Sequence, residues 1–397
     1  MRKRGRTVVI LLAILLALIA LAVLFVLKAR RPAPVPQPTP PAQTPAPSVT
    51  PAPQATPVPT FTPAPLVAKA FELPVEGAAG YASVPMKLRR GPSGSAAAAQ
   101  TLGAGTPFRI VNESGDWFQV DTGSASGWVL GKYCLINLPD IVPSIVYDAT
   151  NTYASIIRSS GKALPGITGK GLYPGKQKND RLGEKQFIMP VLYPMAKKVY
   201  AAQAMALENG ETLVLYEAYR PFEVQMTIVR ALSKLANENK AVLEGISSAP
   251  WTLSWFASTK LSNHQRGGAI DVSLAKVTES SPAISGAYGY TRVLSARRYQ
   301  MPTNMHELSK ASAAFAAPVN SKSRTAWRQA APAPTMNDPA IRLQTYCTKA
   351  GLTPLASEWW HFNDLDTLAL TSSNPGSGRY TLSKCLSTPP SNQGPQT

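Results

Sequence analysis

The sequence predicts an α+β domain with a mixed or antiparallel sheet and helices, preceded by a small all-β barrel and a single transmembrane helix. Three observations lead to this prediction. An unbroken apolar run occupies residues 8–27, and short alternating segments separated by Gly and Ser turns fill residues 69–138. Helical and strand-like patterns then alternate over residues 139–385.

The apolar run at residues 8–27 is long enough to cross a membrane. Its twenty residues would span about 30 Å as a helix. Basic residues in the preceding segment, residues 1–7, predict a cytoplasmic tail. The alternative is a cleavable signal peptide, whose apolar core is usually about 7–15 residues long. Because this run is longer and is followed by Lys28, we expect a retained single-pass anchor in the cell membrane, with extracytoplasmic C-terminal domains.

Residues 28–68 predict a linker. No charged residue occurs from Pro32 to Ala68, and fourteen prolines fall between Pro32 and Pro65. Such a segment is an extended, semi-rigid spacer. The net charge of +18 predicts association with anionic polymers or surfaces. Because export places the protein outside the cytoplasm, nucleic acid is excluded as the partner.

The β-rich segment at residues 69–138 carries a recognisable pattern. Its repeated elements are Leu88-Arg-Arg-Gly-Pro92, Leu102-Gly-Ala-Gly105, Gly115-Asp-Trp117 and Gly127-Trp-Val129. This pattern resembles a bacterial SH3 domain, and the resemblance implies a small barrel that binds cell-wall peptides. Trp117 and Trp128 are interpreted as core or rim aromatics of the barrel rather than as a ligand platform.

The segment at residues 139–385 is predicted to form one domain. Helical spacing appears at residues 191–209, 222–236 and 341–349, and strand patterns appear at residues 212–216 and 269–274. Residues 386–397 are rich in Pro, Ser and Gln and are predicted to be disordered. The three cysteines, Cys134, Cys347 and Cys385, do not make a disulfide framework. We expect unpaired thiols, with a Cys347–Cys385 pair left open.

Two short segments contain the residue types of a catalytic metal site. One runs from Ser262 to Asp271 and includes His264; the other is Glu358-Trp-Trp-His361. Together they contain two of the three histidines of the chain. Catalytic zinc takes three protein ligands and keeps a fourth position for water. The sequence therefore predicts one Zn²⁺ held by His264, Asp271 and His361.

Glu358 is the candidate general base, because a carboxylate beside a metal-activated water can accept its proton. It lies three residues before His361 and cannot share a face with it on a regular strand. We therefore expect a bend or one helical turn there. Each residue taken alone also has an ordinary structural interpretation, and only their joint occurrence favours the metal site.

The complete pattern resembles the zinc D-Ala-D-Ala peptidases, which include the D-alanyl-D-alanine dipeptidases of vancomycin resistance and related carboxypeptidases. The resemblance spans about residues 147–363 and rests on Tyr219-Arg220-Pro221, Ser262-x-His264-x-x-Gly267-x-Ala269-x-Asp271 and Glu358-x-x-His361. It implies that His264, Asp271 and His361 bind zinc and that Glu358 is the general base. It also implies that Arg220 stabilises the tetrahedral intermediate.

The resemblance further places Ser262 near the terminal carboxylate of the substrate and Tyr219 among the substrate-binding residues. The sequence departs from the dipeptidases at one position. Their Met-Gly-Thr stretch leads to an Asp that holds the free amino group, whereas this chain reads Met301-Pro-Thr-Asn-Met-His306. An imidazole is a poorer partner for an ammonium group than a carboxylate is. Either Glu307 compensates, or the enzyme accepts an acylated, peptide-length substrate.

The sequence-based hypothesis is a zinc-dependent D-alanyl-D-alanine dipeptidase that acts outside the membrane in peptidoglycan metabolism. Its partners would be peptidoglycan or peptides containing D-Ala-D-Ala, and the membrane through the N-terminal helix. The alternative is a carboxypeptidase or endopeptidase that trims stem peptides, favoured by His306 and by the exported location. A third possibility is a non-catalytic wall-binding protein, which would predict damage among the site residues.

Overall fold

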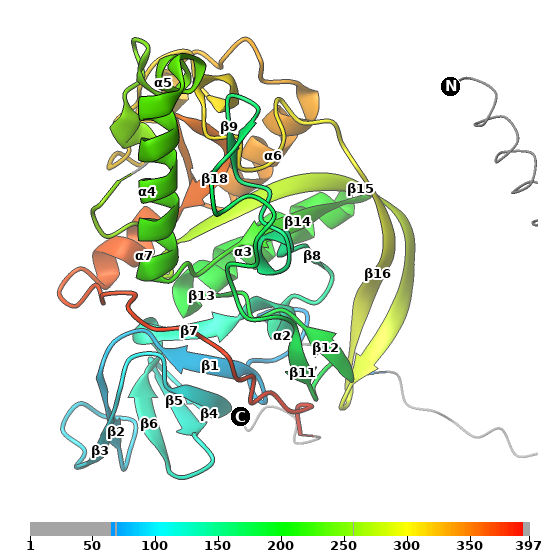
Figure 1. Cartoon of the computed structure of the whole chain (residues 1–397). Helices are drawn as coiled ribbons and strands as arrows, with labels where there is room; N and C mark the ends of the chain where they lie inside the picture. The colour runs from blue at the N-terminus through cyan, green and yellow to red at the C-terminus, as the bar shows by residue number, and fades with distance from the viewer. Residues whose placement is uncertain (1–64, 68–69, 257, 392–397) are drawn as a thin grey trace, which may run out of the picture. The chain divides into compact units, whose positions relative to one another are not determined.

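The computed structural model describes residues 65–67, 70–256 and 258–391 (Figure 1). The predicted cytoplasmic tail, the predicted anchor at residues 8–27 and nearly all of the predicted linker lie outside the described residues. Among the residues that are described, no helix is both long enough and apolar enough to cross a membrane.

The first part of the described chain is a small β unit. Its seven strands are β1 Ala79–Ala82, β2 Met86–Arg89, β3 Ala98–Leu102, β4 Pro107–Ser114, β5 Trp117–Asp121, β6 Ser126–Leu130 and β7 Cys134–Asn137. In β4 and β5, Phe108, Ile110, Phe118 and Val120 are buried, while the residues between them are more exposed, as expected for strands with one face on a core.

The border predicted near residue 138 coincides with the end of β7, but it does not separate two cores. The short strand β13, Pro190–Leu192, belongs to the second part of the chain and pairs antiparallel with β7. Val191 lies opposite Ile136 in that pair. Both side chains belong to one continuous hydrophobic core that extends through both parts. The small β unit is therefore integrated with the larger domain by main-chain pairing and shared packing.

The larger domain is built on a six-stranded mixed sheet. Its order is β17 Thr353–Leu355, β18 Glu358–Asn363, β15 Ala269–Ser285, β14 Glu211–Glu217 and β8 Val146–Tyr147, with β16 Tyr288–Arg298 also paired to β15. The pair β8–β14 is parallel and the other pairs are antiparallel. This arrangement confirms the predicted α+β class with a mixed sheet.

Helices α3 and α6 pack on this sheet, and α4 packs with α5. Their bounds are α3 Tyr193–Glu208, α4 Phe222–Glu238, α5 Lys240–Ser247 and α6 Asp338–Lys349. Three of these match predicted helices to within a few residues. The sequence analysis missed α5 and the short α7, Leu365–Leu370. It also missed α2, Leu138–Ile141. Such short helices depend more on tertiary packing than on a periodic pattern.

The strand predicted at residues 269–274 continues as β15 to Ser285 and turns back into β16 (Figure 1). Beyond Ala275 most of its side chains are at least partly exposed, so the sequence there lacks the apolar alternation that marks a half-buried strand. In Figure 1 the two strands form a long curved ribbon that extends from the sheet toward β12, Glu184–Gln186.

The predicted disorder of residues 386–397 is wrong for residues 386–391. Thr388 N donates to Gly77 O at 2.8 Å, and Ser387 Oγ donates to Asn179 Oδ1 at 3.0 Å. Ser387 is buried. A polar segment can be ordered in this way when the domain surface offers hydrogen-bond partners along its path. Residues 392–397 lie outside the described part of the chain.

All three cysteines are free. Cys134 and Cys347 are buried and Cys385 is half-buried. Burial raises the pKa of each thiol above its ordinary value, which disfavours the reactive thiolate. The expectation of unpaired thiols is thus confirmed, and the Cys347–Cys385 pair that had been left open is not formed.

Candidate metal centre and active site

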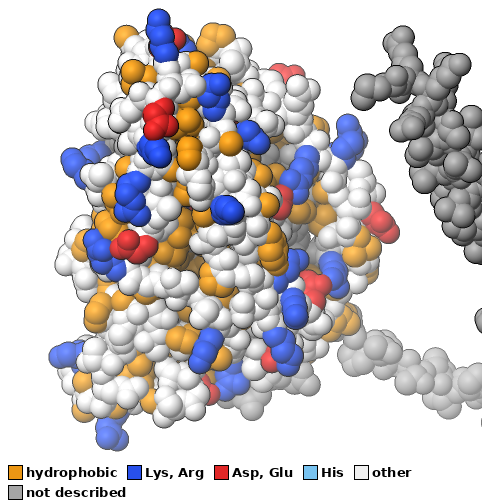
Figure 2. Space-filling view, viewed as in Figure 1, with side chains coloured by type: hydrophobic (Ala, Val, Ile, Leu, Met, Phe, Trp, Pro, Cys, Tyr) orange, Lys and Arg blue, Asp and Glu red, His pale blue; other side chains and the backbone are white. Residues whose placement is uncertain are grey.

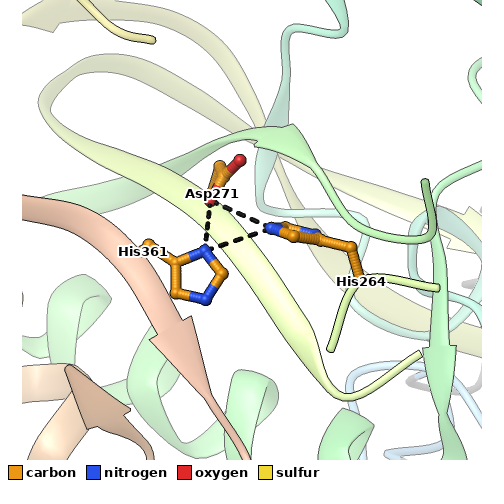
Figure 3. Close-up of side chains that lie close together, drawn as sticks. All are labelled: His264, Asp271 and His361. Carbon is orange, nitrogen blue, oxygen red and sulfur yellow. Dashed lines mark hydrogen bonds and ion pairs between the residues drawn. The ribbon is translucent and has the colours of Figure 1, made fainter. Parts of the chain in front are cut away.

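Three side chains from three segments converge on one point (Figure 3). His264 lies on the loop before β15, Asp271 on β15 and His361 on β18. His361 Nδ1 is 2.9 Å from Asp271 Oδ1 and 3.1 Å from His264 Nε2. His264 Nε2 is 3.3 Å from the same carboxylate oxygen. Bonds of about 2.0–2.1 Å at tetrahedral angles place zinc ligand atoms about 3.4 Å apart, so the cluster is slightly contracted from that geometry.

The hydrogen bonds behind these side chains determine which ring nitrogens are free. His264 Nδ1 lies 2.7 Å from Ala218 O; a carbonyl only accepts, so Nδ1 carries the proton and Nε2 keeps its lone pair. His361 Nε2 lies 3.0 Å from Asn363 Oδ1. The same oxygen accepts from Asn263 Nδ2 at 2.8 Å. His361 Nε2 is therefore the donor, and Nδ1 keeps its lone pair.

Two imidazole lone pairs and one carboxylate oxygen thus face one another inside the protein. His264 and Asp271 are almost completely buried. Lone pairs at such distances repel unless a cation lies between them, and a set of two nitrogens and one oxygen suits zinc. Each histidine also donates its other ring N–H to a protein oxygen, as is common for metal ligands. The residues present therefore fit a catalytic metal.

The sheet register explains why these side chains meet. Asp271 lies opposite Glu217 of β14 on one side and opposite His361 of β18 on the other, so the three side chains project from the same face of the sheet. A β-bulge between Leu215 and Glu217 shifts the β14 register. Without it, Tyr216 would lie opposite Asp271. The bulge therefore brings a carboxylate into the site.

Arg220 is fixed beside the metal centre. Its Nε donates to Glu217 Oε2 at 2.8 Å, and its Nη2 also contacts that oxygen. Nη1 donates to Gln225 Oε1 at 2.7 Å, and Nη2 donates to Asp271 Oδ2 at 3.1 Å. Tyr173 donates its hydroxyl hydrogen to the other oxygen of Glu217. The guanidinium is thus held by two carboxylates and one amide, with 14% of its side chain exposed.

Glu217, Asp271 and His306 form a second group of potential metal ligands. The Arg220 guanidinium already contacts both carboxylates of this group. A second metal ion there would compete with a fixed positive charge. The group of His264, Asp271 and His361, whose ligand atoms also lie within 4.8 Å of one another, is therefore the better candidate for a metal site.

Glu358 lies at the edge of this centre. Its Oε2 is 3.9 Å from His361 Nδ1, and 12% of its side chain is exposed. Burial raises its pKa to about 7, against the lowering effect of His361. The pairing of β18 with β17 shifts register between Phe362 and Glu358. The expected bend or helical turn is not formed, because residues Glu358–Asn363 are one continuous strand; the irregularity is confined to the pairing with β17.

Three further residues predicted for the site, Ser262, Tyr219 and His306, lie in different surroundings. Ser262 lies two residues before His264 in the sequence. Its Oγ is buried and has no hydrogen-bond partner within the described part of the chain. The Tyr219 hydroxyl lies 2.9 Å from Gly378 O and 2.8 Å from Tyr380 O, and its ring stacks on Tyr380. Tyr219 thus holds the C-terminal segment rather than facing the metal ligands. His306 is buried, with its Nε2 3.1 Å from Asp271 Oδ2.

Four residues that shape the site were not predicted from the sequence: Glu217, Tyr173, Asn363 and Asn151, whose amide nitrogen is 3.1 Å from His306 Nδ1. An acidic residue directly after the apolar strand pattern at residues 212–216 was an available signal for Glu217. Asn363 follows His361 by two positions and so shares its strand face. No sequence signal marks Tyr173 or Asn151, which reach the site from loops far away in the chain.

The fold and this site define a metallopeptidase catalytic domain joined to a small β barrel. Residues 175–375, just over half of the chain, match the family model of the D-Ala-D-Ala dipeptidases, and residues 82–131 match that of the bacterial SH3 domain. The chain therefore belongs to the D-Ala-D-Ala dipeptidase family of peptidases and carries an SH3 domain before the catalytic part. A comparison with curated proteins found no match.

Proposed function

We propose that this protein is a zinc-dependent D-alanyl-D-alanine dipeptidase that takes part in peptidoglycan metabolism. One observation carries the proposal. The free lone pairs of His264 and His361 meet Asp271 Oδ1 at 2.9–3.3 Å, and the Glu358 carboxylate lies beside them. The family match supports peptide hydrolysis at D-Ala-D-Ala units.

The metal supplies Lewis acidity, which polarises a carbonyl oxygen and makes water acidic near neutral pH. Glu358 provides the proton transfers. Its carboxylate lies beside the candidate ligand His361, where it can accept a proton from the attacking water and return it to the leaving amine. Its partial exposure leaves a path for substrate and water.

Arg220 opposes the negative charge that develops on the carbonyl oxygen. A guanidinium already held by Glu217 and Gln225 needs little reorganisation during the reaction. Its charge also lowers the pKa of Glu358, so both groups act within the same electrostatic environment. This role requires that the substrate carbonyl approach between Arg220 and the metal ligands.

A specific observation favours a second candidate, a carboxypeptidase acting on acylated D-Ala-D-Ala peptides. A free dipeptide carries an ammonium group, which a carboxylate binds best. His306 directs its Nε2 at Asp271, and Glu217 is engaged by Arg220. Glu307 accepts from the backbone N of Gly161 at 3.2 Å. Within the described residues, an imidazole thus stands where a carboxylate is expected, and Glu307 is buried, with Oε2 engaged by Gly161 and Oε1 without a hydrogen-bond partner.

We also propose that the enzyme acts on the cell-wall side of the membrane. The support is the apolar run at residues 8–27, the proline-rich spacer that follows it and the net charge of +18. Figure 2 shows Lys and Arg side chains spread over the visible face, with fewer acidic ones between them. Such a surface suits an anionic wall. Protease treatment of intact cells would degrade the catalytic domain if this proposal is correct.

The decisive experiment compares three substrates with the full chain loaded with zinc. They are free D-Ala-D-Ala, an Nα-acylated peptide ending in D-Ala-D-Ala, and L-Ala-L-Ala as a control. Cleavage of the free dipeptide supports the dipeptidase, and cleavage of the acylated peptide alone supports the second candidate. If a chelator has no effect, or if neither D-Ala-D-Ala substrate is cleaved, the proposed function is wrong. The SH3 domain is retained because it shares a sheet with the catalytic domain.

A further inference from the structure

The two oxygens of the Asp271 carboxylate have different environments. Oδ1 faces the ring nitrogens of His361 and His264. Oδ2 accepts from Arg220 Nη2 at 3.1 Å and lies 3.1 Å from His306 Nε2. Oδ1 is thus free to bind a metal, whereas Oδ2 is held by Arg220 and His306. An arrangement of this kind orients a ligating carboxylate and restricts it to one mode of binding.

The hydrogen-bond network determines the tautomer of His306. Asn151 Oδ1 accepts from the backbone N of Ile156 at 3.0 Å, so the amide nitrogen of Asn151 faces His306. That nitrogen is 3.1 Å from His306 Nδ1 and donates to it. The imidazole proton is then on Nε2, where it points at an oxygen of Asp271 that can only accept. Both ends of the network require the same tautomer.

The ring and the backbone of His306 are also fixed. The ring meets Trp360 edge-on, with centroids 5.9 Å apart and planes at 89°, and it meets Tyr216 at 77°. The backbone has φ of 58°, a left-handed conformation that is uncommon for residues other than glycine. Arg158 N donates to His306 O at 3.1 Å. Strain of this kind persists where the surroundings hold it.

We propose that His306 is a positioning residue for the metal ligand Asp271, and not a contact for the amino group of the substrate. Both of its ring nitrogens are used, one as acceptor from Asn151 and one as donor to Asp271. No lone pair remains for an ammonium group, and only 3% of the residue is exposed. This inference rests on the proposed metal-dependent function, because a positioned ligand has meaning only with a metal.

The test uses two variants of the full chain, His306→Leu and His306→Gln. Leu and Gln would both be attached to the same left-handed backbone position, and their side chains have similar volumes. Only Gln can donate a hydrogen bond toward Asp271. Zinc affinity is measured by competition with a chromophoric chelator, without any peptide substrate. The absorption spectrum of the Co²⁺-loaded proteins reports the ligand geometry. Thermal unfolding of the metal-free proteins reports any general loss of stability.

We expect His306→Leu to weaken zinc binding about 10–100-fold, the range found for lost partners of metal ligands, and to change the Co²⁺ spectrum. His306→Gln should recover most of the affinity, while both metal-free variants unfold at similar temperatures. Unchanged zinc affinity in His306→Leu would overturn the proposal. A raised KM for the peptide substrate with unchanged zinc affinity would instead assign His306 to substrate binding.

A measurement on the wild-type protein keeps the proposal testable if both variants fail to fold. Long-range ¹H–¹⁵N NMR of the imidazole rings identifies which nitrogen of His306 carries the proton. The proposal requires the proton on Nε2, and a proton on Nδ1 alone would contradict it. A wild-type protein that binds no zinc but shows the Nε2 tautomer would overturn the proposed function while leaving the network itself confirmed.

Discussion

Leu135 of strand β7 packs directly against Gly267, on the loop that carries His264. A methyl group on Gly267 would overlap the Leu135 side chain. Gly267 has φ of 69°, and its carbonyl accepts from Leu192 N at 2.8 Å. Strands β7 and β13 therefore form the support on which the metal-binding loop rests. The sheet that contains the SH3 strands contributes in this way, through β7 and β13, to the geometry of the candidate site.

This contact predicts that Gly267→Ala weakens zinc binding. The new methyl group must displace either Leu135 or the loop, and displacement of the loop moves His264. Gly183→Ala is the matched control, because Gly183 has φ of 70° and nothing lies within 4 Å of the added carbon. We expect at least about a tenfold loss of zinc affinity for Gly267→Ala and none for the control. The double variant Gly267→Ala/Leu135→Ala should recover part of the lost zinc affinity. Equal zinc affinities of Gly267→Ala and the wild type would contradict this account.

Removal of the Glu358 carboxylate should abolish proton transfer without removing the metal. For Glu358→Ala we expect kcat to fall about 10²–10⁴-fold, the usual contribution of a general base, while zinc affinity stays within a few-fold of wild type. His361→Ala serves as the comparison and should lose both properties. Steady-state cleavage of the better D-Ala-D-Ala substrate and chelator competition measure the two effects. Retained kcat in Glu358→Ala would remove Glu358 from the mechanism.

The raised pKa of Glu358 also predicts a pH-dependent stability of the metal-free protein. The pKa is about 7 when folded, against an ordinary value of 4.5. Between these values the folded protein binds more protons than the unfolded chain, so the contribution of Glu358 to the free energy of unfolding falls as pH rises through this window. Glu358→Gln should therefore stabilise the metal-free protein at pH 8 by about 1–3 kcal/mol. This stabilisation should disappear near pH 4.5. Urea unfolding of both proteins at the two pH values measures it. A stabilisation of equal size at pH 8 and pH 4.5 would exclude this explanation.

Glu217 should be essential for the stability of the site. Its carboxylate accepts from Arg220 inside the protein, and removal of one partner leaves the other charge buried and poorly compensated. We expect Glu217→Ala to lower the free energy of unfolding by about 3–5 kcal/mol. Glu238→Ala, which removes an exposed partner of Lys234, should cost at most about 1 kcal/mol. Denaturant unfolding compares the two, and similar losses would show that the buried pair is not stabilising.

The sequence by itself predicted a peptidase of the D-Ala-D-Ala family and the residues of the candidate metal site. His264, Asp271, Glu358 and His361 carry their chemistry in their residue types, and their spacing on a loop and two strands allows one site. The amphipathic helices and the buried strands were also predictable, because local periodicity records which face is buried. The bend or helical turn expected between Glu358 and His361 was not found, since both residues lie on the continuous strand β18.

Only the tertiary structure decided the support of that site. Glu217 reaches Asp271 through a β-bulge, Asn151 sets the tautomer of His306 from a distant 3-10 turn, and Leu135 contacts the loop of His264 from strand β7. These contacts join residues far apart in the chain, and hydrogen-bond direction and steric fit decide them. Local sequence patterns encode which residues are buried, but not which distant partners they meet. For that physical reason the sequence could predict the candidate metal ligands but not the residues that position them.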